Sequence, residues 1–99
     1  MKRIYLSGRI TGTTDYMERF SACEKMLTRA GFEVMNPAKV NSNMPPSTTW
    51  KEYMMMSLTM LSLCDTIFMM DGWRKSKGAN TEWRHAVNTG MNILYEGGV

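Results

Sequence analysis

Four short β-rich segments alternate along this chain with helical patterns, and that alternation restricts the fold more than any other feature. The segments are RIYLS (3–7), FEVMN (32–36), TIFMM (66–70) and MNILY (91–95). Each is short, apolar and rich in residues that favour strands. Helices are expected over 15–30, 50–63 and 78–88, and a long loop over 37–48, where two prolines stand together. The predicted order is therefore β-α-β-α-β-α-β.

Local signals support the helix boundaries. Asp15 with Glu18, and Thr49 with Glu52, have the spacing of a capping box, in which two side chains bond to the first turn of a helix. Gly31 stands where a glycine often follows a helix. The tail after 95 is expected to be too short to form an element.

The strands are apolar on both faces, which indicates a parallel sheet covered by helices on both sides. With right-handed crossovers, the expected strand order is 2-1-3-4. The prediction is a single α/β domain over 1–99, a small flavodoxin-like or Rossmann-like three-layer sandwich with a four-stranded parallel sheet.

Composition limits the class of protein. The chain is 43% hydrophobic and 21% charged, which is globular rather than disordered material, and its net charge of +3 is too small to make a nucleic-acid partner the expectation. Two cysteines without CxxC spacing or a nearby histidine cluster predict no zinc site. The first residues lack the apolar core of a signal peptide, and no apolar run is long enough for a membrane span. A cytoplasmic protein without metal or organic cofactor is expected. The small size and the 12 methionines favour a homodimer or higher homo-oligomer.

Ligands of such sheets bind beyond the carboxyl ends of the strands, where the strand order reverses. Two loops lie at that point, 8–14 and 71–77. In the first, Gly8 and Gly12 offer backbone amides beside Arg9, although the glycine spacing fits neither a dinucleotide fingerprint nor a P-loop. In the second, Ser76 and Gly78 stand at a helix start, where amides and a hydroxyl can bind an anion. A simple turn and a solvated charge run remain the alternatives.

Glu82 follows this second loop and shares a helix face with Ala79 and Ala86. It is either an acid stabilised by the helix dipole or a reactive carboxylate held at the rim of the sheet. Asp71 stands at the carboxyl end of the third strand, where it could also take part. Tyr5 and Trp73 each have two interpretations: they contact a ligand, or they belong to the core.

Several motifs together resemble a known group of proteins. IYLSG, EVMNPA, the W-x-x-Y-M pattern at 50–54 and CDTIFMMDGWRKSKGANTEWRHA look like a small phage and bacterial family of uncharacterised domains (DUF4406-like). That family is similar to the nucleoside 2-deoxyribosyltransferases and to the deoxynucleoside 5'-monophosphate N-glycosidases. The resemblance covers nearly the whole chain.

The resemblance implies an enzyme that needs no cofactor and acts on a nucleotide or nucleoside. Glu82 matches the glutamate that attacks the sugar, and Tyr5 matches a tyrosine near it. Ser76 matches the serine that binds phosphate in the glycosidases, where the transferases tend to carry an aspartate, and Arg9 lies in a loop that contacts phosphate there. Substrate contacts are also expected from Ser7, Gly8, Gly12, Trp73 and Gly78.

One position departs from the relatives. They carry a second acid on the helix before the third strand, which is thought to help protonate the leaving base, whereas this chain has Ser57 there. Asp71 is one candidate to replace it. The leading hypothesis is cleavage or exchange of the N-glycosidic bond of a (deoxy)nucleoside 5'-monophosphate through a glutamyl-sugar intermediate. The alternatives are a nucleotide-binding module without catalysis, or a nucleic-acid accessory protein that uses Arg74, Lys75 and Lys77.

Overall fold

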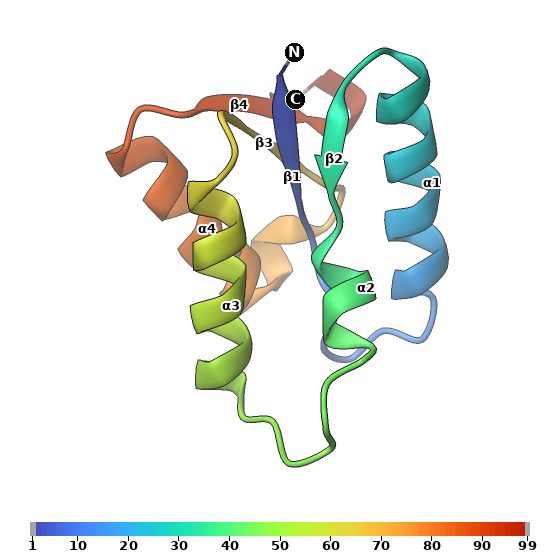
Figure 1. Cartoon of the computed structure of the whole chain (residues 1–99), viewed down its shortest axis with the longest axis vertical. Helices are drawn as coiled ribbons and strands as arrows, with labels where there is room; N and C mark the ends of the chain where they lie inside the picture. The colour runs from blue at the N-terminus through green and yellow to red at the C-terminus, as the bar shows by residue number, and fades with distance from the viewer. Residues whose placement is uncertain (1, 99) are drawn as a thin grey trace.

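The four strands of the computed structural model form one parallel sheet in the order β2-β1-β3-β4, which confirms the predicted topology (Figure 1). The structure describes residues 2–98. Its strands are β1 (Arg3–Ser7), β2 (Glu33–Met35), β3 (Thr66–Met69) and β4 (Asn92–Tyr95). Tyr5 in β1 lies between Met35 of β2 and Ile67 of β3, so β1 and β3 are the two central strands.

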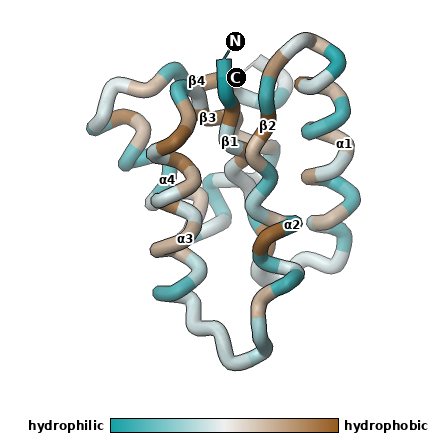
Figure 2. The backbone as a smooth tube through the Cα atoms, in the orientation of Figure 1, coloured by the Kyte–Doolittle hydropathy of each residue, from teal (hydrophilic) through white to brown (hydrophobic). Residues whose placement is uncertain are grey.

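Helices cover both faces of this sheet. The long helices are α1 (Tyr16–Arg29), α3 (Trp50–Ser62) and α4 (Lys77–Asn88). Figure 1 shows α1 on one side of the strands, with α3 and α4 on the other. In Figure 2, α1 alternates between hydrophilic and hydrophobic positions, as an amphipathic helix on a sheet does. The result is the expected three-layer arrangement.

Two hydrophobic cores fill the spaces between these layers. On the α1 side, β1 contributes Ile4 and Leu6, which pack with Phe20 and Leu27. On the α3 and α4 side, the cluster contains Tyr5, Leu61, Ile67, Met69, Trp73, Ala79 and Ala86. Successive residues of a strand point to opposite faces, so β1 supplies both cores.

The structure corrects the prediction of an uninterrupted loop over 37–48. A short helix, α2 (Pro37–Asn41), begins directly after β2. The Asn36 side chain accepts a hydrogen bond from the backbone N–H of Ala38 at 3.0 Å, and Pro37 occupies the first helical position, where it costs no hydrogen bond. The asparagine-proline pair is therefore a helix start inside the stretch predicted as a loop.

The two predicted capping boxes have different outcomes. At α3, Thr49 and Glu52 exchange both expected hydrogen bonds, at 2.8 and 3.1 Å. At α1, the Asp15 side chain makes no capping bond, so that part of the prediction is wrong. Two short 3₁₀ helices were also not predicted: η1 (Trp73–Lys75) and η2 (Glu96–Gly98), the second in the tail that was expected to hold no element.

Two general features of the described part of the chain bear on its chemistry. Between residues 2 and 98, no helix is both long and apolar enough to cross a membrane. In the same range, no three His, Cys, Asp or Glu side chains gather closely enough to hold a metal ion.

Candidate active site

Two residues of the site come from β1, whose successive side chains point to opposite faces of the sheet. Tyr5 and Ser7 point to the face covered by α3 and α4, and both side chains are fully buried. A buried hydroxyl group needs a hydrogen-bond partner, because it has lost those of water. Both hydroxyls find that partner in the same residue, Glu82.

Glu82 reaches them from α4. Ser76 caps this helix by accepting a hydrogen bond from the backbone N–H of Ala79 at 3.1 Å, which sets where the helix begins. Ala79, Glu82 and Ala86 form its buried face. The two alanines let the helix lie close to the sheet, so Glu82 between them is only 6% exposed.

Each oxygen of the Glu82 carboxyl group accepts one hydrogen bond. The Tyr5 hydroxyl donates to Oε2 and the Ser7 hydroxyl donates to Oε1, both at 2.6 Å. Such short distances are typical of hydroxyls that donate to a carboxylate. The two donors fix the position of the carboxyl group from the sheet side.

Burial raises the pKa of Glu82 to about 7, because a charged carboxylate is poorly solvated there. The hydroxyls of Ser7, Tyr5 and Ser57 act in the opposite direction and lower that pKa, since they stabilise the anion. The pKa of Tyr5 is raised well above its usual value, first by burial and then by the negative charge of Glu82. Tyr5 therefore stays protonated and remains a donor, while Glu82 changes charge near neutral pH.

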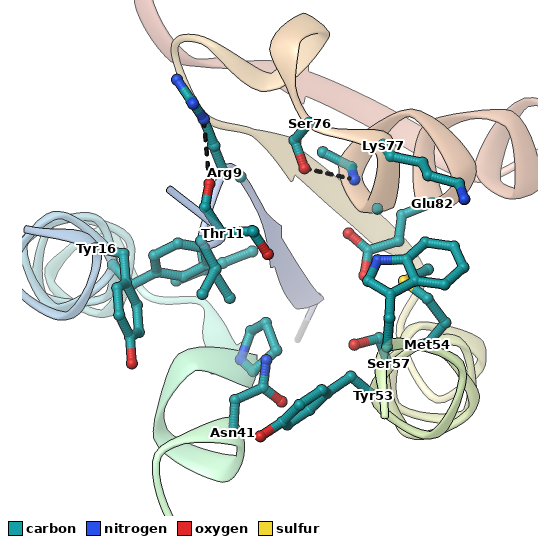
Figure 3. A pocket seen from close by; sticks show the side chains of 18 of the residues that line it. Arg9, Thr11, Tyr16, Asn41, Tyr53, Met54, Ser57, Ser76, Lys77 and Glu82 are labelled. Atoms are coloured by element: carbon teal, nitrogen blue, oxygen red, sulfur yellow. Dashed lines mark hydrogen bonds between the residues drawn. The ribbon is translucent and has the colours of Figure 1, made fainter. Parts of the chain in front are cut away.

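A cavity of about 600 Å³ opens next to Glu82, at the carboxyl end of β1 and beside the start of α4. Its wall comes from β1 and the loop after it, from α1, α2 and α3, and from the start of α4 (Figure 3). The lining residues are Tyr5, Leu6, Gly8, Arg9, Ile10, Thr11, Gly12, Tyr16, Phe20, Pro37, Asn41, Trp50, Tyr53, Met54, Ser57, Lys75, Ser76, Lys77, Gly78, Ala79 and Glu82. The cavity therefore lies where the sequence predicts a ligand to bind, at the point where the strand order reverses.

Two glycines shape the loop after β1. Gly12 has a φ of 81°, a left-handed conformation that glycine adopts without strain, and a Cβ there would lie 3.1 Å from Nη2 of Arg9. A Cβ at Gly8 would lie 3.0 Å from Sδ of Met70. The Arg9 side chain also donates from Nε to the carbonyl of Thr11 at 3.3 Å, so loop and side chain are held together.

Most of the predicted site residues come together in this cavity, but Ser7, Asp71 and Trp73 do not line it. Ser7 is fully buried and contacts the site through its hydrogen bond to Glu82. Asp71 is exposed; its backbone N–H donates to Oε1 of Glu96 at 2.7 Å and its carbonyl accepts from Arg19 at 2.8 Å. Trp73 is buried in the core and stacks on Trp83, with ring centroids 5.5 Å apart. Neither residue lines the cavity, so the structure does not bring either one to the place where a ligand would contact it.

One wall of the cavity lies outside the predicted substrate contacts. Trp50, Tyr53, Met54 and Ser57 all face it from α3. Their spacing of three, one and three places them on one side of a helix, and this pattern was the available signal. Ser57 is only 5% exposed.

The fold and this site define a small α/β domain with a buried carboxyl group at the rim of a parallel sheet. Residues 2–95 match the family described as "Domain of unknown function (DUF4406)", so the chain belongs to that family. No curated protein matches the sequence.

The fold resembles the solved structure of a 2-deoxyribosyltransferase from Bacillus psychrosaccharolyticus. The TM-score is 0.75 and the identity is 16%, and the match covers 94% of this chain and 70% of the other. At this identity the likeness shows a shared fold.

Proposed function

We propose that this protein cleaves or exchanges the N-glycosidic bond of a (deoxy)nucleoside 5'-monophosphate, with Glu82 as the nucleophile. The observation that carries the proposal is the Glu82 carboxyl group, buried, held by two hydroxyl donors at 2.6 Å and facing a cavity. The cavity volume of about 600 Å³ lies within the range of small-molecule sites. The structural likeness to a 2-deoxyribosyltransferase supports this class of reaction.

The reaction would proceed in two steps. A carboxylate oxygen of Glu82 attacks C1' of the sugar, the C1'–N bond breaks, and its electron pair leaves with the base. Water or a second base then attacks C1', and the carboxylate is released. A covalent ester divides one difficult substitution into two easier ones. Tyr5 and Ser7 position the nucleophile, because each donates a hydrogen bond from the sheet to one of the two oxygens of Glu82.

The labelled side chains of Figure 3 suggest how a nucleotide would lie. Arg9, Ser76 and Lys77 are at one end of the cavity, and Tyr53 and Asn41 are at the other. Glu82 stands in the side wall between these ends (Figure 3). The cations and the Ser76 hydroxyl can donate hydrogen bonds to a phosphate, whereas the Tyr53 ring can stack on a base. The sugar would then lie beside Glu82.

The first experiment measures release of free base from a panel of nucleosides and their 5'-monophosphates. Glu82→Gln keeps the size of the side chain and removes the nucleophile, so base release should fall at least about 1000-fold. Glu18→Gln makes the same chemical change at an exposed position and should retain full activity. Equal rates for the wild type and Glu82→Gln would refute the proposal.

A second pair of variants tests the phosphate. Asparagine and aspartate both cap helices well, so Ser76→Asn and Ser76→Asp should both preserve the start of α4. Only the aspartate places a negative charge beside a phosphate dianion, which should lower kcat/KM for monophosphates at least about 100-fold relative to Ser76→Asn. Equal values for the two variants would show that phosphate does not bind at Ser76.

Ser57 also supports a second candidate function, a module that binds a nucleotide without cleaving it. This hydroxyl lies in the cavity wall next to Glu82, at the position where the family resemblance implies an acid. Isothermal titration with deoxynucleoside monophosphates separates the two. Tight binding with no base release from any substrate would favour the binding module.

We also propose that the protein self-associates and acts in the cytoplasm. Exposed apolar side chains support self-association: Met55 is 63% exposed, and Leu63, Val87 and Leu94 are exposed as well. Cys23 and Cys64 are both free thiols, which suits a reducing compartment. Light scattering of the purified chain should give a dimer or larger species, and a monomer across all concentrations would contradict the first part.

A further inference from the structure

Within the described residues 2–98, Glu82 is the one aspartate or glutamate that lines the cavity. The other polar side chains of the wall are hydroxyls, the Asn41 amide and the cations Arg9, Lys75 and Lys77. If Glu82 attacks the sugar, it cannot also protonate the base that leaves. Ser57, the polar group next to it, has a hydroxyl that is far too weak an acid for that task.

The lack of a second carboxylic acid among the described residues of the wall restricts which bases can leave. A neutral purine or pyrimidine departs as an anion unless a proton reaches it, and general acid catalysis of such a step contributes about 100-fold to 10,000-fold. A base that already carries a positive charge needs no proton. When its C1'–N bond breaks, the electron pair neutralises the ring and the base leaves uncharged.

Resting on the function proposed above, we infer that this site acts on nucleotides whose base is a cationic heterocycle. Two sources share that chemistry: purines alkylated at N7, and pyridinium bases such as nicotinamide. Glu82 forms the ester with C1' while the neutral base departs. Water then adds to C1' and restores the carboxylate, and each turnover releases one proton to solvent. No oxidant, metal or second carboxyl group is required.

The wall of the cavity supports this inference independently of the missing acid. The rings of Tyr16, Phe20, Trp50 and Tyr53 line it, and the face of an aromatic ring attracts a cation. The Trp50 ring already faces a cation, because the Nζ of Lys77 lies 4.3 Å from its centroid, so the other three rings are the ones that a cationic base would contact. The side-chain oxygen of Asn41, at the same end as Tyr53, is buried and has no hydrogen-bond partner among residues 2–98. Its partial negative charge would also favour a cationic base.

The test compares guanine with N7-methylguanine, which differ by one methyl group and the positive charge that it brings to the ring of the nucleotide. Release of guanine and of N7-methylguanine is measured from the same 5'-phosphorylated sugar, with spontaneous release subtracted, and nicotinamide mononucleotide is the third substrate. The wild type should release N7-methylguanine at least about 100-fold faster than guanine. Release of nicotinamide together with N7-methylguanine would show that any cationic base is accepted, and release of N7-methylguanine alone would limit the class to alkylated purines.

Ser57 provides the matched variants. Ser57→Asp places an acid beside Glu82, and Ser57→Asn has nearly the same shape without the acid. The aspartate variant should raise guanine release and lower the ratio of the two rates at least about 10-fold, while the asparagine variant should leave the ratio unchanged. The wild-type ratio decides the question even if Ser57→Asp does not fold.

The outcomes separate this inference from the function on which it rests. Equal release of guanine and N7-methylguanine by the wild type would overturn the inference and leave the proposed function standing. No release of any base, with no difference between the wild type and Glu82→Gln, would overturn both.

Discussion

Ile4 and Leu6 on one face of β1 pack in a hydrophobic cluster with α1, whereas Tyr5 and Ser7 on the other face bond to a carboxyl group from α4. The two faces are equally buried, since all four side chains are fully inaccessible. The two faces differ in the free-energy change that accompanies the burial of their side chains. Hydrocarbon gains free energy when it leaves water, but a carboxylate loses it unless it is hydrogen-bonded.

One strand of five residues therefore serves two purposes. The α1 face stabilises the domain, and the α4 face gives up some stability to hold an ionisable group at the edge of a cavity. The difference should be visible in how stability depends on pH, since only one face contains a group that titrates near neutrality.

The largest expected effect on stability is on the hydrophobic face. Leu27 in α1 is 6% exposed and does not line the cavity. Leu27→Ala should lower the free energy of unfolding by about 2–5 kcal/mol, because it removes buried carbons and leaves a space. Urea denaturation at pH 5 and at pH 8 should give the same loss. A loss of stability that differs strongly between the two pH values would contradict the view that the hydrophobic face is independent of pH.

The next effect is on the polar face and has the opposite sign. The pKa of Glu82 is about 7 in the folded protein and close to 4.5 in the unfolded chain. The unfolded chain therefore loses its proton first as the pH rises, and the folded state is destabilised progressively between these values, by at most about 3 kcal/mol above pH 7. Glu82→Gln removes this penalty. It should match the wild type near pH 4.5 and be more stable at pH 8, as thermal unfolding can measure. A variant less stable at pH 8 would contradict the prediction.

The smallest expected effect concerns the hydroxyl groups that donate hydrogen bonds to Glu82. Ser7→Ala removes one hydroxyl that stabilises the carboxylate, so the pKa of Glu82 should rise further. The rising limb of kcat/KM against pH should move upward by about one pH unit, the value of one such hydrogen bond. Leu27→Ala, measured in parallel, should leave the limb in place. A limb that does not move in Ser7→Ala would show that Ser7 has no influence on the nucleophile.

Much of the fold could be predicted from the sequence, because periodicity reports burial directly. Strands apolar on both faces and helices with one apolar face determined the parallel sheet and its order, and Thr49 with Glu52 marked a helix start. α2 was missed because two prolines further on were given more weight than the cap formed by Asn36 and Pro37.

The site was predicted less completely, for physical reasons. The sequence placed Tyr5 and Glu82 near the switch point, but their direct hydrogen bond follows from the alternation of β1 combined with the placement of α4. Asp71 follows β3, yet Gly72 turns the chain with a φ of 83° and the side chain of Glu96 holds the Asp71 amide. These are contacts between distant parts of the chain, and local patterns do not report them.

The hydrogen bonds of β1 to Glu82 also stabilise the native register of this central strand against a shifted one. A slip of one residue would exchange the two faces of β1. Ile4 and Leu6 would then face the carboxyl group of Glu82 without donating to it, and the hydroxyls of Tyr5 and Ser7 would be buried among the hydrocarbon side chains of α1. Each unpaired polar group would cost about 1–3 kcal/mol, so a misaligned sheet is selected against by the same three side chains that form the site.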